Sequence, residues 1–458
     1  MTVAVVTPEE MAAVDRSART PVDVLIARAG GAVARVALDV LGGAYGRRVV
    51  VVAGKGNNGA DGRAAAQVLA GRGVRVTVLG AAAASAGAVL PEADLVIDAA
   101  YGTGFRGSYQ PPAVGDTPVV AVDIPSGLSG TTGVVGGAAM AAVATVTFQA
   151  YKPGLLLGAG PDLCGAVVVA DIGLGPEVAA IATAWLVTDS DVRWLAPRLR
   201  EANKWQSAVL VVGGSPGMMG APALVSRAAM RAGAGYARLG VPGAPLASLP
   251  SGEAVGVELP ATGWETAAAE AATRCQAVVV GPGLGRGASV APSVAALLQQ
   301  VEAAVVVDAD ALNALGSVAH LTEAVAGRAA ATVITPHEGE YARMTGGPPG
   351  DDRLAGVRAV AAASGAVVLL KGSPTIVAAP DGHALFVTSG SSRLATAGTG
   401  DVLGGVIGAF LARGLGGPEA AALGAHVHGR AAGNGRRIGL VAGDLPELVA
   451  DWLSSAAP

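Results

Sequence analysis

The chain has 458 residues, of which 52% are hydrophobic and 14% charged, and its formal net charge is −4. This length predicts about two domains, and the apolar content is enough for large buried cores. The slightly negative charge and the lack of a basic run argue against a nucleic-acid-binding or membrane-surface protein. We therefore expect no nucleic acid and no membrane among its partners.

Cysteine usage and the first residues favour a cytoplasmic protein. Cys164 and Cys275 lie far apart without metal-ligand spacing, which predicts reduced core thiols. The start, "MTVAVVTPEEMAAVDRSA", does not combine a basic with an apolar segment, so no signal peptide is expected. The longest uncharged run, residues 124–151, is broken by Pro125 and many glycines, which favours strands and loops over a membrane helix.

Short β-branched runs alternate with alanine-rich helical stretches in the first half of the chain. Continuous apolar strands that alternate with helices predict an α/β fold, in which a parallel sheet is covered by helices on both faces. The predicted strands lie near residues 47–54, 74–80, 93–99, 117–127, 144–148 and 165–173.

The pattern restarts after residue 205 with five further predicted strands. Between the two series, residues 179–205 contain charges, a proline and three of the five tryptophans. We therefore expect an N-terminal domain at 1–200 and a second domain at 201–458. The second series of predicted strands lies near residues 206–215, 276–285, 302–312, 330–340 and 365–373.

The glycine-rich turn "AGKGNNGADGR" follows the first predicted strand. Gly54, Gly56 and Gly59 have the G-x-G-x-x-G spacing of a phosphate-binding turn at a helix N-terminus. A redox dinucleotide site also needs an acid about 20 residues further on, where this chain reads "VTVLGAAA". The turn is therefore unlike a hydride-transfer site. An Asx-rich turn with a helix cap is the alternative for Asn57, Asn58 and Asp61.

Two more strand ends carry side-chain oxygens. Asp98 begins "DAAYGTGFRG", and "VDIPSGLSG" contains Asp123 and Ser126. The carboxyl ends of parallel strands share one edge, so Asn58, Asp98 and Ser126 are expected to converge there. Hard oxygen ligands suit a group 1 or group 2 cation better than zinc.

Asp123 is the predicted catalytic residue of this half. A carboxylate at a crowded strand end near a cation suits a general acid or base, and a turn cap is the alternative role. Lys152, in "YKPG", is interpreted as a surface lysine outside the site.

The segments "AGKGNNGADGR", "DAAYGTGFRG" and "VDIPSGLSGTTGVVGGAAMAAVATVTFQAYKPGLL" resemble the YjeF N-terminal family of NAD(P)H-hydrate epimerases. The resemblance implies a Rossmann-like three-layer αβα domain and potassium bound by Asn58, Asp98 and Ser126. The family usually reads N-N-G-G-D where this chain has Ala60, whose methyl group could crowd the loop. The implied substrate-binding residues are Asn57, Asn58, Gly59, Ala60, Asp61, Gly102, Thr103, Gly104, Phe105, Arg106, Gly107, Ser108 and Asp123.

The strongest motif of the second half is "RLATAGTGDVLGGVIGAFLARG", at 393–414. The N–H groups of Gly398, Thr399 and Gly400 can form an anion hole at the start of an apolar helix. Asp401 beside them can take the proton of an attacking hydroxyl, or can simply cap the helix. No P-loop motif occurs in the sequence.

Other strand ends of this half carry His337, Lys371, Asp308 and Asp310. The histidine is expected to hydrogen-bond a ligand without acting as a catalyst, and the lysine ammonium suits a phosphate. Magnesium coordination and helix capping both remain open for the two aspartates.

The second half resembles the ribokinase-like superfamily and, more closely, the ADP/ATP-dependent NAD(P)H-hydrate dehydratase family. The matching segments include "VVGGSPGMMGAPALVSRAAMRAGAGYARLGVP", "VVVGPGLG", "VVDADALNAL", "TPHEGEYARM" and "LLKGSPTIVA". The family's entry segment resembles His-Lys-Gly, whereas this chain reads Asn203-Lys204-Trp205. The resemblance implies substrate binding by Ala221, Gly283, Gly285, His337 and Asp401, and adenine-nucleotide binding by Lys371, Gly372, Ser373, Pro374, Thr375 and Gly400.

Together the resemblances imply repair of hydrated NADH and NADPH (NADHX and NADPHX). The first domain would interconvert the (R) and (S) hydrates with K⁺ bound. The second would dehydrate the (S) hydrate with Mg²⁺ and ADP, or ATP, and release AMP and phosphate when ADP is used. We also expect a homo-oligomer. A kinase for a small alcohol and a non-catalytic binding protein are the alternatives.

Overall fold

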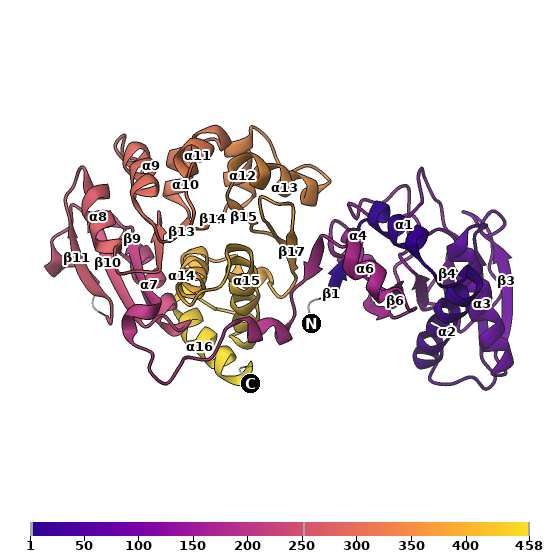
Figure 1. The fold of residues 1–458 in the computed structure, drawn as a ribbon. Coiled ribbons are helices and arrows are strands. Elements are labelled where there is room, and N and C mark those ends of the chain that lie inside the picture. The colour runs from indigo at the N-terminus through magenta and orange to yellow at the C-terminus, as the bar shows by residue number, and fades with distance from the viewer. Residues whose placement is uncertain (1–2, 251, 457–458) are drawn as a thin grey trace. The chain divides into compact units, whose positions relative to one another are not determined.

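The computed structural model describes residues 3–250 and 252–456, which form two compact units (Figure 1). The N-terminal unit is Val3–Ala184, and the C-terminal unit begins at Trp185. The sequence analysis predicted the domain boundary at residue 200. The segment after residue 184 belongs to the second unit because Val187 donates a backbone hydrogen bond to Phe386 at 2.9 Å, and Asp189 contacts His426 at 2.8 Å.

The sheet of the N-terminal unit has the strand order β3-β2-β4-β5-β6-β7, and all of its neighbours are parallel. The predicted parallel sheet is thus confirmed. Every residue of β4, β5 and β6 is buried, as expected for strands covered on both faces. The strands of this unit are β1 Val3–Val5, β2 Arg48–Ala53, β3 Arg75–Gly80, β4 Leu95–Ala99, β5 Val119–Val122, β6 Ala144–Phe148 and β7 Ala166–Ala170.

Helices α2 and α3 pack tightly against each other in this unit. A Cβ atom at Gly30 of α2 would lie 2.5 Å from the Cβ of Ala64 in α3, so only glycine permits this approach. The contact fixes α3, whose first turn carries the asparagine pair. The helices are α1 Pro8–Ser17, α2 Val22–Leu41, α3 Asn57–Gly71, α4 Pro153–Leu156, α5 Gly160–Leu163 and α6 Gly175–Ile181.

The sheet of the C-terminal unit contains the strand order β17-β16-β15-β14-β13-β12-β9-β10-β11. The predicted strands β9, β12, β13, β14 and β15 pair in parallel, as expected, whereas β15-β16-β17 is an antiparallel meander that the sequence analysis did not predict. The strands are β8 Ala184–Leu186, β9 Ala208–Val212, β10 Tyr236–Pro242, β11 Val255–Leu259, β12 Ala277–Val280, β13 Ala304–Val307, β14 Thr332–Ile334, β15 Val367–Leu370, β16 Thr375–Ala378 and β17 Ala384–Val387.

Helix α14 runs through the core of this unit and is buried along nearly its whole length. A Cβ atom at Gly405 would lie 2.3 Å from the carbonyl oxygen of Val225, so this glycine lets α14 approach α7. The α-helices are α7 Gly220–Arg231, α8 Trp264–Ala272, α9 Val290–Gln300, α10 Asp310–Leu315, α11 Val318–Val325, α12 Glu338–Thr345, α13 Arg353–Ser364, α14 Thr399–Ala412, α15 Gly417–Asn434 and α16 Leu445–Ala456. The 3₁₀ helices are η1 Asp189–Trp194, η2 Lys204–Ser207, η3 Leu246–Ser248, η4 Ser392–Leu394 and η5 Ala442–Asp444.

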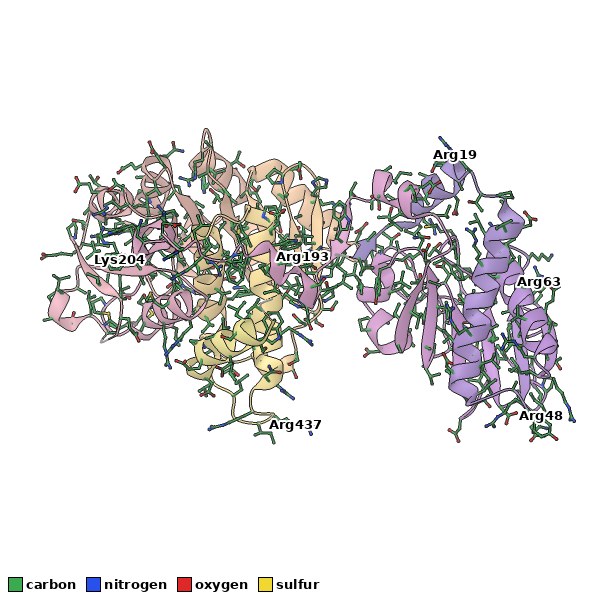
Figure 2. All side chains as sticks on the ribbon, turned by 60° about the horizontal axis from the view of Figure 1, so that its bottom comes forward. Arg19, Arg48, Arg63, Arg193, Lys204 and Arg437 are labelled. Carbon is green, nitrogen blue, oxygen red and sulfur yellow. The ribbon has the colours of Figure 1, made fainter. Side chains whose placement is uncertain are left out.

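The cysteines, the helices and two of the arginines can be compared with what the composition predicts. Both cysteines are free and buried, as predicted. Among the described helices, none is both long and apolar enough to cross a membrane. Figure 2 shows Arg19 and Arg48 at opposite ends of the N-terminal unit, so these two cations do not share a patch.

Candidate active sites

A cavity of about 1020 Å³ opens at the carboxyl ends of the strands of the N-terminal unit. It is lined by α1, by α2 and by the loops that follow β2, β4, β5 and β6. Of the predicted substrate residues, Gly59, Ala60, Gly107 and Ser108 are not in this lining. Those that do line it are Asn57, Asn58, Asp61, Gly102, Thr103, Gly104, Phe105, Arg106 and Asp123.

Asp98 and Ser126 meet directly beneath this cavity. Both residues are fully buried, and the Ser126 hydroxyl donates to Asp98 Oδ1 at 2.6 Å while its backbone N–H donates to Oδ2 at 2.8 Å. Burial raises the pKa of Asp98, and the hydrogen bonds from Ser126 partly offset this. No ion pair with Asp98 occurs among the described residues. Among the described residues, the carboxyl group of Asp98 is therefore stabilised by hydrogen bonds alone.

Asn58 stands next to the loop that follows Asp98. A Cβ atom at Gly102 would lie 3.3 Å from Asn58 Cγ. The side-chain Oδ1 and Nδ2 of Asn58 are buried and have no partner among the described residues. A buried amide oxygen without a hydrogen-bond donor is a ligand type that suits a hard cation, and so is the buried carboxyl group of Asp98.

Asp123 forms an ion pair that the sequence analysis missed. Its Oδ1 lies 2.7 Å from Nζ of Lys152, whose side chain is only 1% exposed. The interpretation of Lys152 as a surface lysine is therefore wrong. Thr147 also donates to Asp123 Oδ1, at 3.1 Å. Asp123 has φ +67°, a left-handed conformation that costs energy in a residue other than glycine and is common at functional sites.

Two further carboxyls face Asp123 across the cavity. The pKa of Asp61 is raised to about 8, mainly by burial and also by the charges of Asp123 and Asp15. Burial also raises the pKa of Asp15, which the Lys152 ammonium lowers in part. Near neutral pH, Asp61 is therefore a proton donor.

The site of the C-terminal unit centres on the start of α14 and on Lys371, after β15. Lys371 Nζ lies 3.2 Å from Asp308 Oδ1 and 3.7 Å from Glu340 Oε2. It would also lie 3.6 Å from a Cβ atom at Gly400. Burial lowers the pKa of Lys371, but these carboxylates outweigh it and leave the pKa raised. The ammonium is thus a fixed positive charge beside the proposed anion hole.

Asp401 occupies the first turn of α14, and its pKa is raised to about 6. Burial is the main cause, Asp308 adds to it, and Lys371 opposes it. In the proposed anion hole, the N–H of Thr399 donates to the Thr396 carbonyl at 3.3 Å, and the Thr399 hydroxyl is bonded to the Leu394 and Thr396 carbonyls. The hydroxyl of Thr399 therefore holds the turn, whereas Gly400 is the position that faces Lys371.

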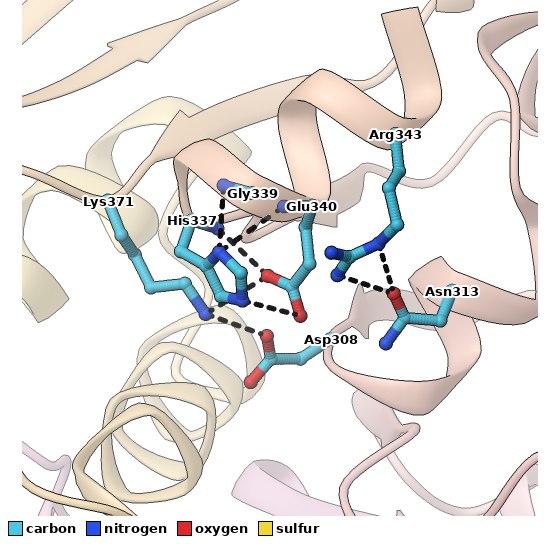
Figure 3. A network of polar contacts seen from close by, with 7 residues as sticks. All are labelled: Asp308, Asn313, His337, Gly339, Glu340, Arg343 and Lys371. Carbon is cyan, nitrogen blue, oxygen red and sulfur yellow. Dashed lines mark hydrogen bonds and ion pairs between the residues drawn. The ribbon is translucent and has the colours of Figure 1, made fainter. Parts of the chain in front are cut away.

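His337 lies at the N-cap of α12, as Figure 3 shows. Its Nδ1 accepts hydrogen bonds from the N–H groups of Gly339 at 3.0 Å and Glu340 at 3.2 Å. Because Nδ1 accepts, the proton of the neutral ring is on Nε2, and the side chain is 54% exposed. His337 can therefore donate to a ligand from Nε2.

The turn after β12 brings Gly283 and Ala221 together. A Cβ atom at Gly283 would lie 3.4 Å from that of Ala221, and the N–H of Gly285 donates to Asp310 Oδ2 at 2.9 Å. A second cavity, of about 420 Å³, begins at Gly285. Arg343, whose guanidinium is held by Asn313, also lines this cavity (Figure 3).

The predicted nucleotide loop follows Lys371. Thr375 Oγ1 donates to the Gly372 carbonyl at 3.2 Å, and the Ser373–Pro374 bond is cis. A Cβ atom at Gly372 would lie 2.7 Å from Arg353 Nη2, and Arg353 itself is paired with Glu338. The loop is thus bordered by the cation of Arg353 as well as by Lys371.

Comparison with known proteins separates the same two regions. Residues 22–88 and 81–154 match the family model described as YjeF-related protein N-terminus, and residues 209–452 match the model described as NAD(P)H-hydrate dehydratase. The chain belongs to the bifunctional NAD(P)H-hydrate repair enzyme family. The predicted family membership is therefore confirmed.

Similar proteins span nearly the whole chain. The bifunctional NAD(P)H-hydrate repair enzyme Nnr of Moorella thermoacetica is 36% identical over 97% of this chain and 95% of its own length. The enzyme of the same name from Mycobacterium tuberculosis is 41% identical, over 83% of this chain and 82% of its own.

Among solved structures, the ADP/ATP-dependent NAD(P)H-hydrate dehydratase from Bacillus subtilis, co-crystallised with ATP and Mg²⁺, has a TM-score of 0.51 and 28% identity. It covers 59% of this chain and 97% of its own length. A ribokinase-like superfamily protein from Enterococcus faecalis has a TM-score of 0.51 at 21% identity, over 60% of this chain and 97% of its own. The predicted ribokinase-like fold of the second domain is confirmed.

Proposed function

We propose that this chain restores NADH and NADPH from their hydrates, with an epimerase in the N-terminal unit and an ADP-dependent dehydratase in the C-terminal unit. The supporting observation is that each unit gathers acidic and basic side chains at the carboxyl edge of its sheet. Membership of the repair family supports the choice of substrate.

The chemistry of the substrate explains what each unit must do. When water adds to the enamine double bond of a dihydropyridine, the hydroxyl goes to the carbon bonded to the ring nitrogen, since that nitrogen stabilises a cation there. The product is a hemiaminal that exists as two epimers. A stereospecific dehydratase would use only one of them, so an epimerase makes both usable.

In the N-terminal unit, we assign proton transfer to Asp123. The carboxylate takes the proton of the hemiaminal hydroxyl, the carbon–oxygen bond becomes a carbonyl, and the carbon–nitrogen bond breaks with its electron pair going to nitrogen, which takes a proton. Asp61, protonated near neutral pH, can supply that proton. Rotation of the free carbonyl followed by the reverse steps gives the other epimer.

Potassium fits the three oxygen-bearing side chains at the base of this cavity. Asn58, Asp98 and Ser126 would hold the ion, with the unpartnered amide of Asn58 and the buried carboxylate of Asp98 as the main support. A bound K⁺ would neutralise Asp98 and fix the loop after β4. The expected observable is a gain in thermal stability with K⁺ that Na⁺ does not reproduce.

In the C-terminal unit, Asp401 accepts the proton of the substrate hydroxyl as the oxygen attacks the terminal phosphorus of the nucleotide. The bond from that phosphorus to its bridging oxygen breaks, and its electron pair leaves with AMP when ADP is the donor. Phosphate then leaves the ring carbon and a proton leaves the neighbouring carbon, which regenerates the double bond. Lys371 and the N–H of Gly400 would stabilise the charge on the transferring group.

Magnesium is the metal that such a transfer needs. The Bacillus subtilis dehydratase was co-crystallised with ATP and Mg²⁺. Asp308 and Glu340, both close to Lys371, are the carboxylates that could hold it here. We also infer that small-molecule substrates are its partners. The homo-oligomeric state and the cytoplasmic location stay predictions.

The decisive experiment incubates the full chain with a mixture of both NADH hydrates, Mg²⁺, K⁺ and either ADP or ATP. The proposal predicts complete recovery of NADH absorbance, and it predicts AMP and free phosphate with ADP. A stable phosphate ester in place of NADH would contradict the dehydratase assignment. Recovery of only one epimer, with the other left unchanged, would contradict the epimerase assignment.

A further inference from the structure

Lys152 is the most deeply buried charged side chain at the edge of the N-terminal cavity. Its side chain is 1% exposed, and it lies immediately before α4. A buried ammonium is costly unless charges and hydrogen bonds compensate for its lost hydration. The compensation is complete here: Nζ contacts Asp123 at 2.7 Å, Thr147 Oγ1 at 2.9 Å and the Phe148 carbonyl at 3.1 Å.

These contacts orient Asp123 as well as stabilising the lysine. Lys152 and Thr147 both approach Oδ1 of Asp123. Asp123 also lines the cavity, with 14% of its side chain exposed, so Oδ2 is the oxygen left to face a ligand. The left-handed backbone of Asp123 is a second sign that its side chain is held in an imposed direction.

We propose that Lys152 is a positioning residue that holds Oδ1 of Asp123, so that Oδ2 is directed into the cavity and can accept the proton of the hydrated substrate. The proposal rests on the assignment of epimerase chemistry to Asp123. The ammonium of Lys152 is almost wholly covered, so it cannot bind the substrate directly. The proposal gives this buried lysine a function through its contact with Asp123.

The surrounding charges show why a cation is needed at this place. Asp15 of α1 and Asp61 of α3 face Asp123, and Glu9, Lys55 and Arg106 also line the cavity. Burial raises the pKa of Asp61 to about 8, with further contributions from the charges of Asp123 and Asp15. Among these three carboxyls, Asp123 is the one that the buried cation of Lys152 contacts directly, at 2.7 Å.

The test compares Lys152→Met with the wild type, using the full chain and an assay that resolves the two epimers without nucleotide. We expect kcat for epimerisation to fall about 100-fold or more with little change in KM, in the range typical of lost acid–base catalysis. The acidic limb of the pH profile should move to higher pH, because the variant removes the positive charge that lies 2.7 Å from Asp123 Oδ1. Dehydration of the (S) hydrate should keep its wild-type rate.

Chemical rescue distinguishes positioning from simple structural support. Adding ethylamine to Lys152→Ala should restore part of the epimerase rate by placing an ammonium in the vacated space, whereas ethanol should not. Arg19→Met, which removes an exposed cation outside the cavity lining, is the matched control and should leave the rate unchanged. A folded Lys152→Met enzyme with the wild-type rate and pH profile would overturn the proposal.

The same experiments separate this proposal from the function on which it rests. If the wild type does not interconvert the hydrates, or if Asp123→Asn does so normally, the epimerase assignment itself is wrong. If Asp123→Asn is inactive while Lys152→Met keeps the wild-type pH profile, only the role of Lys152 is overturned. If Lys152→Met fails to fold, ethylamine rescue of Lys152→Ala decides, and failure of rescue counts against the proposal.

Discussion

Both units place a lysine beside an aspartate at the carboxyl edge of a sheet, but the two lysines are exposed differently. Lys152 is 1% exposed, and its ammonium contacts Oδ1 of the proposed base Asp123. Lys371 is 23% exposed and pairs with Asp308, while the proposed base Asp401 lies on another element. A covered lysine can act only through its neighbours, whereas a partly exposed one can bind a ligand phosphate. Burial thus decides which role the same residue type has.

The pKa values of the carboxyl groups Asp61 and Asp401 also differ between the two sites. Burial is the main cause of a raised pKa at both Asp61, at about 8, and Asp401, at about 6. At Asp61 the neighbouring charges that act on the pKa are carboxylates, which raise it. At Asp401 the carboxylates of Asp308 and Asp310 also raise the pKa, but Lys371 lowers it. Near neutral pH, one carboxyl is therefore a proton donor and the other a proton acceptor.

The largest expected effect tests whether the two sites work independently. Asp401→Asn removes the proposed base but keeps the shape of the side chain, so dehydration should fall about 10³-fold. Epimerisation should continue at the wild-type rate, measured by the epimer ratio without nucleotide. Loss of both activities with the fold retained would break the separation of the two units.

A smaller effect is expected where Lys371 is replaced. Lys371→Met removes the ammonium that would contact the nucleotide phosphates, so KM for ADP should rise about 10- to 100-fold, with KM for the hydrate less affected. Lys204→Met is a matched control, since Lys204 lies on η2 against the rings of Trp205 and Tyr236. An unchanged KM for ADP in Lys371→Met would contradict the nucleotide assignment.

The pH dependence of the dehydratase should follow Asp401. A base must be ionised, so kcat/KM should be level above pH 6 and fall about tenfold per pH unit below it. Since Lys371 lowers the pKa of Asp401, this limb should move to higher pH in Lys371→Met. If the acidic limb of the kcat/KM profile lies at the same pH in Lys371→Met as in the wild type, Lys371 does not influence the pKa of Asp401.

The smallest effect concerns stability and sharpens the contrast between the carboxyls. The pKa of Asp61 in the folded state, about 8, exceeds the value of about 3.9 for an unfolded aspartate, so the folded state binds the extra proton between these values. The contribution of Asp61 to stability is therefore greatest at low pH and is lost as pH rises to about 8. Asp61→Asn should reduce by a few degrees the drop in Tm between pH 5 and pH 8.5, measured by calorimetry.

Asp116→Asn, at an exposed position, is the control for that measurement and should keep the wild-type drop. An Asp61→Asn variant whose Tm falls with pH as steeply as that of the wild type would indicate that Asp61 is not the carboxyl that keeps its proton.

Local patterns were enough to predict much of the fold and part of each candidate site. Valine-rich runs identified the parallel strands because strands buried on both faces must be continuously apolar. The glycine turns identified where α3 and α14 begin. The oxygen groups at strand ends identified Asp98 and Ser126, which the sheet brings into contact.

What the sequence left undetermined depends on contacts between distant segments. The strands β16 and β17 pair antiparallel at one side of the sheet, and residues after 184 join the second unit through Val187. Neither feature has a periodicity of its own. The exclusion of Lys152 from the site failed for the same reason.

The sequence by itself determined the two α/β units, the family and the residue types at the edges of the sheets. Only the tertiary structure decided which of those side chains are charged and which face a ligand. The turn after β6 folds Lys152 back against Asp123 and removes both from most of the solvent. Burial and charge pairing are properties of neighbours in space, and they set whether a carboxyl holds or gives up its proton.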